Sequence, residues 1–464
     1  MDELLLQNPW WEDKKNILND VHIKKLKGCK YIFEPEMFKS SDLDKDAVYT
    51  LRGARQVGKT TLVKLIIKKL LGENINPRNI FYYSMDLVKD DKELFGIFLS
   101  WYQTVKEDSR RKYIFFDEAT FVNNWEKSIK HIVDTVGLEK KTFILTGSSA
   151  IDLRKGSERL PGRRGVSNPD KLLLPLSFKE FCNLTGLKIS LELENNNISI
   201  DTIKKNIPEL KIYQSELEFF LDKYLVCGGF LESINSFFRN NIIGEETFER
   251  YISVLFSEIE KVKKSRVTAK NILASIIDSL SSTVSWNRLA KKSGNISTNT
   301  VIDYVNVFSD SFILYYIEYF NMHKFAGNPA KEKKLYFFDP FYYQITSRII
   351  NLPYLKISRS CIIESLIGAH LVRNFEKGIY QGFSNIEKIF YWESSKDKEI
   401  DFILNRPGND ILPLEVKYQN IINPIDYITI KNSFTGGIVV SKNTFSVEEN
   451  IIILPASSLL YLLN

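Results

Sequence analysis

Residues 53–60 have the types and the spacing of a phosphate-binding P-loop. They read Gly-Ala-Arg-Gln-Val-Gly-Lys-Thr. Gly53 and Gly58 allow a tight turn that points backbone N–H groups at phosphate oxygens, next to the positive end of a helix dipole. We expect Lys59 to reach the β- and γ-phosphates and the Thr60 hydroxyl to be a ligand of Mg²⁺. The motif predicts a nucleotide site made by Gly53, Ala54, Arg55, Gln56, Val57, Gly58, Lys59, Thr60 and Thr61.

Two acidic residues follow a second apolar run and could complete a hydrolytic site. Residues 113–116 read Tyr-Ile-Phe-Phe, and Asp117 and Glu118 come directly after them. Such a run favours a strand covered on both faces, with the acids where it leaves a parallel sheet. We expect Asp117 to hold Mg²⁺ through water, and Glu118 to orient or deprotonate the water that attacks the γ-phosphate. This Walker B pattern predicts hydrolysis of the nucleotide.

Polar residues beyond a third apolar run, 142–145, could respond to the γ-phosphate. Thr146 and Ser148 are the candidates, although hydroxyls after a strand also cap helices. Four arginines follow in a stretch that is predicted to be an exposed loop. One of them could act as an arginine finger within the chain or on a neighbouring subunit, and a solvated basic loop is the alternative. They are Arg154, Arg159, Arg163 and Arg164.

A second set of functional groups lies near the C-terminus. Residues 399–404 and 412–417 predict two strands joined by a turn, and therefore a hairpin. Alternation along the strand places Glu415 and Lys417 on one face, with Asp401 on the neighbouring strand. Asp401 and Glu415 could share Mg²⁺ or Mn²⁺, and Lys417 could position the attacking water. The alternative is that these side chains form cross-strand ion pairs.

A further carboxylate could join this C-terminal cluster. Glu364 lies in an amphipathic stretch, 362–375, that predicts a helix able to present it to the hairpin. With Glu364, the cluster would have three acidic ligands for a divalent metal.

Alternating short strands and helices over residues 41–186 predict the parallel α/β sheet that these motifs require. Strands are expected at 47–51 and 79–84 and a helix at 61–71. Ahead of the sheet, Trp10 and Trp11 could cover an adenine ring or anchor the N-terminal arm, and we favour the anchor.

Residues 270–320 have the rhythm of a winged helix, with Ser285 and Ser297 as N-caps. The third helix carries Asp303 and Asp310 where DNA phosphates would need bases, so packing is as good an interpretation. Better candidates for DNA contacts, with solvated surface as the alternative, are Lys261, Lys263, Lys264, Arg266, Lys270, Lys331, Lys333 and Lys334.

Composition excludes several classes of protein. The 464 residues carry a net charge of +6 and 44% hydrophobic residues, which suits a multidomain globular chain. The cysteines and histidines are scattered, so neither a disulfide framework nor a zinc site is predicted. Apolar runs fall short of the roughly twenty residues that a membrane helix needs, and we expect a cytoplasmic protein that contacts no membrane.

Taken together, these motifs resemble the archaeal and bacterial AAA+-like ATPases that couple a P-loop domain to a C-terminal PD-(D/E)XK nuclease-like domain. The resemblance covers nearly the whole chain, but the proline of the nuclease signature is absent. It implies ATP rather than GTP, and an archaeal source. It rests on residues 7–11, 53–60, 115–118, 145–149, 161–164, 175–181, 228–230 and 399–417.

The expected fold class is α/β, with a P-loop NTPase domain, a helical and winged-helix region, and a restriction-endonuclease-like domain. We expect an ATPase that acts on DNA as a motor or an ATP-dependent nuclease, and that could form a homo-oligomer. The alternative is a nucleotide-dependent switch that docks a protein partner and has a catalytically idle C-terminal domain. The expected segments are an N-terminal arm (1–40), the ATPase domain (41–186), a helical lid (187–265), a winged-helix-like domain (266–335) and the nuclease-like domain (336–464).

Overall fold

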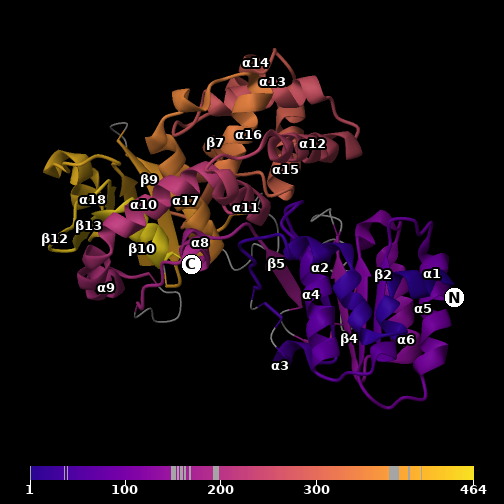
Figure 1. Cartoon of the computed structure of the whole chain (residues 1–464). Coiled ribbons are helices and arrows are strands. Elements are labelled where there is room, and N and C mark those ends of the chain that lie inside the picture. The colour runs from indigo at the N-terminus through magenta and orange to yellow at the C-terminus, as the bar shows by residue number, and fades with distance from the viewer. Residues whose placement is uncertain are drawn as a thin grey trace. The chain divides into compact units, whose positions relative to one another are not determined.

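A computed structural model of the chain describes two compact units, Met1–Leu174 and Pro175–Asn464 (Figure 1). The chain passes to the second unit earlier than the predicted boundary at 186. The reason is local: Leu176 N donates to Gly229 O over 2.8 Å, and Tyr224 OH donates to Leu176 O over 2.5 Å. The described residues are 2–35, 37–38, 40–147, 153, 156, 160, 164–166, 169–191, 198–375, 386–394, 398–408 and 410–463.

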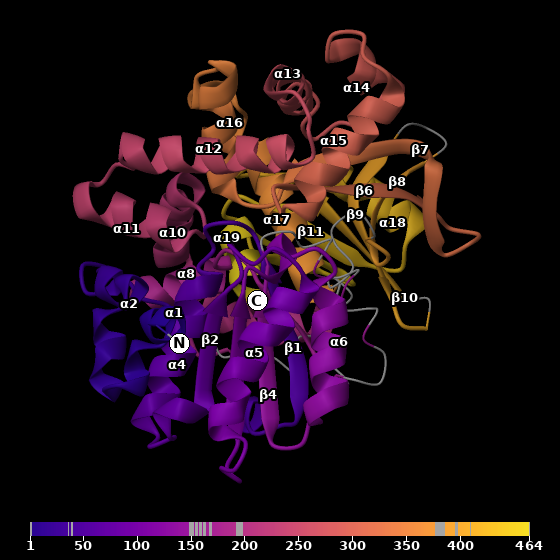
Figure 2. The ribbon, with the colours of Figure 1, turned by 90° about the vertical axis from the view of Figure 1, so that its right-hand side faces the viewer.

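The first unit is built on a five-stranded parallel sheet with the strand order β2-β3-β4-β1-β5. All residues of the central strands β1, β3 and β4 are buried, as their apolar sequences predict. Helices α5 and α6 lie on one face of the sheet (Figure 2). The parallel α/β sheet expected for this unit is therefore confirmed. Its main elements are β1 (Ala47–Gly53), α4 (Lys59–Gly72), β2 (Ile80–Ser84), α5 (Asp91–Val105), β3 (Lys112–Asp117), α6 (Trp125–Val136), β4 (Lys141–Thr146) and β5 (Asp170–Leu173).

The N-terminal segment covers the open edge of β2 with side chains instead of a further strand. It contains α1 (Asp2–Gln7), and α2 (Val21–Leu26) follows. Asn8 imitates a strand partner, because its Nδ2 donates to Tyr82 O over 2.9 Å and its Oδ1 accepts from Tyr82 N over 2.7 Å. Gln7 Oε1 accepts from Ser84 N over 2.7 Å. Backbone groups that would otherwise be free to pair with another chain are thus occupied.

The two tryptophans complete this edge cover. Trp10 and Trp11 are buried, and their Nε1 atoms donate to Ile80 O over 3.1 and 2.8 Å. This geometry favours the interpretation that the two tryptophans anchor the N-terminal segment over the one in which they cover an adenine ring, because both indole N–H groups are hydrogen-bonded to the strand.

The second unit contains an eight-stranded mixed sheet with the order β12-β13-β11-β10-β9-β8-β6-β7. β9 and β10 pair antiparallel, so the predicted hairpin is confirmed. β10, β11 and β13 pair in parallel. The strands are β6 (Leu314–Asn321), β7 (Ala326–Phe337), β8 (Ile389–Glu393), β9 (Glu399–Arg406), β10 (Asp410–Val416), β11 (Gly437–Ser441), β12 (Ser446–Glu448) and β13 (Ile451–Pro455).

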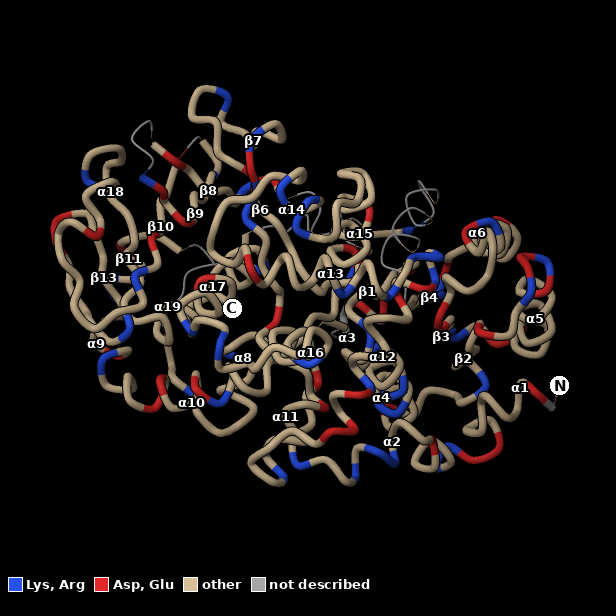
Figure 3. The backbone as a smooth tube through the Cα atoms, turned by 90° about the horizontal axis from the view of Figure 1, so that it is seen from above, with Lys and Arg blue, Asp and Glu red and all other residues tan. Residues whose placement is uncertain are grey.

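Helices precede and flank this sheet. Lys and Arg positions are interspersed with Asp and Glu positions along the second unit (Figure 3). Among the described residues, no helix is both long and apolar enough to span a membrane. The helices are α8 (Phe178–Thr185), α9 (Ile200–Ile212), α10 (Gln214–Cys227), α11 (Leu231–Asn240), α12 (Glu245–Lys261), α13 (Arg266–Ile277), α14 (Trp286–Lys292), α15 (Thr298–Asp310), α16 (Pro340–Ile350), α17 (Arg359–Phe375), α18 (Ile428–Ser433) and α19 (Ala456–Leu462).

The region predicted to be a winged helix has three helices followed by the β6–β7 hairpin. Ser285 and Ser297 accept hydrogen bonds from Arg288 N and Thr300 N over 3.2 and 3.0 Å, as predicted for N-caps. The hairpin, however, belongs to the eight-stranded sheet, and the predicted boundary at 335 falls inside β7. Strand pairing between distant segments joins this region to the sheet, and local sequence patterns do not report such pairing.

Candidate functional site

The P-loop lies where β1 ends and α4 begins, as the sequence predicts. Gly53 has a φ of 152°, and a Cβ there would lie 2.0 Å from Leu173 O, so no larger residue fits. Gly58 has a φ of 104° and caps α4 in the left-handed region that favours glycine. The two glycines therefore shape the loop, and the N-terminus of α4 supplies N–H groups and dipole charge for an anion.

Lys59, in the first turn of α4, is held over the loop. Its Nζ donates to Gly53 O over 2.9 Å and to Ala54 O over 3.1 Å, and the residue is only 7% exposed. The ammonium is thus already positioned among the loop residues that would surround a phosphate. Next along the helix, Thr61 Oγ1 lies 3.5 Å from His22 Nδ1 in α2, so the N-terminal segment also contacts α4.

Asp117 and Thr146 end β3 and β4 at the carboxyl edge of the sheet, where β1 leads into the P-loop. Asp117 is 2% exposed and accepts from the Thr146 hydroxyl at Oδ1 and from Tyr82 OH at Oδ2 over 3.0 Å. Glu118 N donates to Thr146 Oγ1 over 3.1 Å. One hydroxyl therefore contacts the Asp117 carboxylate and the Glu118 backbone, whereas the sequence had suggested a phosphate sensor or a helix cap.

Glu118 itself has a left-handed backbone, with a φ of 55°. This conformation is uncommon for a residue other than glycine, asparagine or aspartate, and such backbones concentrate at functional sites. The side chain is half-buried. Both features agree with the expected role of Glu118 beside a γ-phosphate.

A buried tyrosine and a buried lysine, which the sequence pattern did not reveal, lie behind Asp117. Lys64 of α4 places its Nζ 3.2 Å from the centroid of the Tyr82 ring and 3.3 Å from Asp20 Oδ2. Burial lowers the pKa of Lys64, and Asp20 opposes that shift. Burial and the charge of Asp117 raise the pKa of Tyr82, so this phenol stays protonated as a donor to Asp117. The only sequence signal was the spacing of Lys64 one turn beyond the P-loop.

Of the hydroxyl and arginine candidates that remain in the first unit, only Arg164 is among the described residues. Ser148 and Arg163, with Arg154 and Arg159, lie outside the described residues. Arg164 pairs with Asp170 through two nitrogens over 3.0 and 3.2 Å, and its Nε donates to Val48 O over 3.2 Å. Val48 is near the start of β1, five residues before the P-loop begins, or about 16 Å along a strand. This geometry favours a structural role for Arg164 over an arginine finger.

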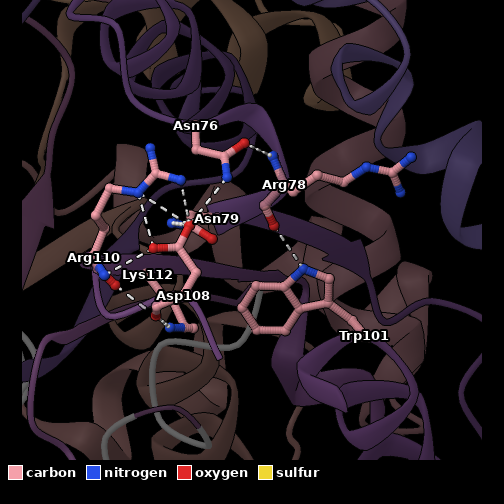
Figure 4. A network of polar contacts seen from close by, with 7 residues as sticks. All are labelled: Asn76, Arg78, Asn79, Trp101, Asp108, Arg110 and Lys112. Atoms are coloured by element: carbon pink, nitrogen blue, oxygen red, sulfur yellow. Dashed lines mark hydrogen bonds and ion pairs between the residues drawn. The ribbon is translucent and has the colours of Figure 1, made fainter. Parts of the chain in front are cut away.

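A polar cluster also lies at the amino edge of this sheet, around Asp108 (Figure 4). Its carboxylate accepts from Asn76 and Asn79 over 3.1 and 2.9 Å and pairs with Arg110 over 2.6 Å. The Arg110 guanidinium holds the pKa of Asp108 well below its usual value, although burial opposes this. The cluster lies at the opposite edge of the sheet from the P-loop. It therefore stabilises the beginnings of β2 and β3 and does not belong to the nucleotide site.

The second unit brings together the four residues predicted near its hairpin. Glu415 Oε1 lies 2.6 Å from Lys417 Nζ, and Glu415 Oε2 accepts from Asp401 N over 3.4 Å. Glu364, from α17, joins them through Lys334 of β7, whose Nζ lies 3.0 Å from Glu364 Oε1 and 2.9 Å from Asp401 Oδ1. The predicted cluster therefore exists, with an additional cation inside it.

Lys334 is fully buried and also pairs with Glu399. In a flat sheet, β7 would lie three strand spacings from β9, about 14 Å, farther than a lysine side chain extends. The sheet can fold over because β6 pairs with β8 at one residue pair only, Tyr319 with Tyr391. The prediction that Lys334 and Lys333 are exposed candidates for DNA contacts is wrong, because both side chains are buried.

The charged groups of this cluster shift one another's pKa values. Burial and Asp401 raise the pKa of Glu415 to about 8, although Lys417 opposes the shift. Burial lowers the pKa of Lys334. The negative charges of Asp401 and Glu364 outweigh the effect of burial, so the pKa of this ammonium is raised. Over the described ranges, no group of three or more histidine, cysteine, aspartate or glutamate side chains has the arrangement of a metal site.

Comparison with known proteins finds a match for the segment that contains the P-loop. Residues 45–182 match the family model described as an AAA domain. This segment is therefore similar to AAA domains. Residues 219–349 and 361–459 of the chain match two models described as domains of unknown function, DUF8612 and DUF4143. The nuclease-like assignment of the C-terminal segment therefore stays a prediction.

Three of the proteins to which the chain is similar come from archaea. The uncharacterized protein MJ1544 of Methanocaldococcus jannaschii is 25% identical over 413 residues, which cover 86% of this chain and 81% of that protein. The Walker-type ATPase PABY2304 of Pyrococcus abyssi is 14% identical, with a TM-score of 0.39 over 66% of this chain and 91% of that structure. The Aeropyrum pernix ORC1 protein in complex with DNA is 9% identical, with a TM-score of 0.30 over 65% and 86%.

Proposed function

We propose that the chain binds ATP together with Mg²⁺ and hydrolyses the ATP at the P-loop. The observation that carries this proposal is the Thr146 hydroxyl, which contacts Asp117 and accepts from Glu118 N. It holds the carboxylate of Asp117, the expected magnesium ligand, and the backbone of Glu118, the candidate base, at the sheet edge from which the P-loop emerges. A domain that only stored a nucleotide would need the loop but not this pair of oriented acids.

Each residue has a role that its position permits. Lys59 would exchange its bonds to the Gly53 and Ala54 carbonyls for bonds to phosphate oxygens. Thr60 and Asp117 would hold Mg²⁺, which supplies charge neutralisation at the phosphates when it is bound. Glu118 would orient the attacking water or accept its proton.

The decisive experiment replaces Glu118 with glutamine, which keeps the size of the side chain and removes its ability to accept a proton. E118Q is expected to lower the ATP turnover of the full chain by about 100-fold or more while ATP still binds. The control is E107Q, since Glu107 has a side chain that is 92% exposed. Unchanged turnover in E118Q would reject the assignment of the base.

For what hydrolysis drives, we favour a switch that docks a protein partner over a DNA-processing enzyme. Lys264 lies 3.2 Å from Asp303 Oδ2, and Arg266 lies 2.5 Å from Glu260 Oε1. With Lys333 and Lys334 buried, four of the basic residues proposed to meet DNA phosphates are engaged elsewhere. Phosphate binding requires accessible cations, so the two buried lysines cannot contribute to it, and Lys264 and Arg266 would first have to leave their acidic partners.

The strand pairing of the first unit supplies a route by which the nucleotide could be sensed. Gly53, the first residue of the P-loop, pairs with Leu173, the last residue of β5. The second unit begins two residues later, at Pro175. A shift of the loop on hydrolysis would therefore act directly on the segment that enters the second unit.

A further inference from the structure

The carboxylate cluster of the second unit was expected to hold a divalent metal, so the fit of its residues to a metal can be tested. Asp401 and Glu415 are the expected ligands. Asp401 Oδ1 accepts from Lys334 Nζ over 2.9 Å, and Asp401 Oδ2 accepts from Val416 N over 2.8 Å. Glu415 Oε1 contacts Lys417 Nζ over 2.6 Å, and Glu415 Oε2 accepts from Asp401 N. All four oxygens therefore already have a donor.

Glu364, the third expected ligand, is engaged in the same way. Its Oε1 accepts from Lys334 Nζ over 3.0 Å and from Tyr336 OH over 2.5 Å. Lys334 and Tyr336 lie on the same face of β7 because strand neighbours alternate. This strand therefore brings an ammonium and a phenol to the carboxylates, and both are hydrogen-bond donors to oxygens that a metal would otherwise use.

The ammonium also stands where it would oppose a metal most strongly. Its three acidic partners among the described residues come from α17 and β9, and its side chain is fully buried. A divalent cation bound to Asp401 or Glu364 would lie within a few ångströms of this positive charge, in surroundings that screen poorly. To admit the metal, Lys334 would have to lose its partners without reaching water, which is costly for a buried charge.

We propose that the Lys334 ammonium is the resident cation of this cluster and takes the place that a divalent metal would need. The cluster is then a metal-independent ion-pair centre that joins β7, α17 and β9. Lys334 is a positioning residue, and metal-assisted hydrolysis of a phosphodiester is not the chemistry of this site. The inference does not depend on ATP hydrolysis, because no residue of the first unit takes part in it.

The test measures binding of Mn²⁺ alone to the full chain after chelator treatment and without nucleotide, by the electron paramagnetic resonance signal of free Mn²⁺. The wild type is expected to have no Mn²⁺ site that D401N removes. K334M, which keeps length but not charge, is expected to bind Mn²⁺ at least about tenfold more tightly than the wild type. That gain should disappear in K334M/D401N.

K333M is the matched control. Lys333 is adjacent on β7 and also buried, but its Nζ contacts Pro329 O and Lys331 O instead of the carboxylates. It should gain no Mn²⁺ site. If K334M does not fold, K334M/E399Q removes one positive and one negative charge together and serves in its place. Wild-type binding that D401N abolishes, or a folded Lys334 variant that gains no site, would overturn the proposal.

Discussion

At the scale of single residues, Thr146 has the contact that the hydrolytic proposal needs most. Its hydroxyl has one proton to donate, which goes to Asp117, and lone pairs that accept from Glu118 N. Movement of Thr146 would therefore disturb the Asp117 carboxylate and the Glu118 backbone together. Its place at the end of β4, in a position where all neighbouring strand residues are buried, restricts such movement. Thr146 therefore positions the two acids without itself having to touch the nucleotide.

Substitution of Thr146 with valine tests this role. Valine keeps the branched shape but removes the hydroxyl, so Asp117 loses a donor and Glu118 N loses its acceptor. We expect kcat for ATP hydrolysis to fall by about 10- to 100-fold, as is usual when a partner that orients a metal ligand is lost. The Kd for ATP should stay within about threefold, because the phosphate-binding loop is intact.

The control for this variant is T104V on the surface of α5, where the hydroxyl donates only to its own helix at Trp101 O over 2.7 Å. It should hydrolyse ATP at the wild-type rate. Equal kcat values for T146V and the wild type would show that Glu118 and Asp117 do not depend on this hydroxyl.

At the scale of elements, the edge of β2 is closed by side chains of the N-terminal segment. Asn8 supplies both a donor and an acceptor to Tyr82, and it also donates to Leu4 O over 2.9 Å. Asn8 is fully buried, so water cannot replace these bonds when the side chain is removed. The stability of the parallel sheet should therefore depend on a residue outside every strand.

N8A is expected to lower the free energy of unfolding of the first unit by about 2–4 kcal/mol, since two buried backbone groups of Tyr82 lose their partners. Urea unfolding of the full chain measures the effect. The exposed Asn19 gives the control, N19A, which should change stability by less than about 0.5 kcal/mol. An N8A variant as stable as N19A would mean that the edge groups find other partners.

Elements with local signals were predictable from the sequence. The P-loop, its flanking strand and helix, and the β9–β10 hairpin each depend on a few adjacent residues, and the structure confirms them. The convergence of Glu364 with Asp401 and Glu415 was also expected, since alternation and helix periodicity set their faces.

The position of Lys334 could not be predicted in the same way. Adjacent residues of a strand normally alternate between a buried and an exposed face, but Lys333 and Lys334 are both buried. The sequence pattern therefore does not show which face of β7 is buried. The ion pairs of Lys334 depend on the fold of the sheet between β6 and β8, which a single pair of tyrosines spans. The edge cover by Asn8 is equally non-local, because Asn8 and Tyr82 are separated by more than seventy residues. Such contacts follow from tertiary pairing rather than from a pattern.

At the scale of the whole molecule, the choice between DNA and a protein partner depends on how many accessible cations remain. Besides the buried and paired lysines and arginine, Lys261, Lys263 and Lys331 are exposed and Lys270 is half-buried. A site that neutralises several phosphates releases as many counterions, and its affinity then falls steeply with salt. These four lysines are fewer than the six or more phosphate contacts that give a steep dependence.

The salt dependence of DNA affinity can be measured on the full chain, with and without ATP. Binding to duplex DNA is expected to weaken by less than about threefold between about 50 and 200 mM salt, whereas six or more phosphate contacts would cost about a thousandfold. Fluorescence anisotropy of a labelled duplex measures the affinity, and K331A should leave the slope unchanged. A steep slope that K331A reduces would contradict the partner-docking switch and favour DNA, because each lost phosphate contact lowers the slope by about one.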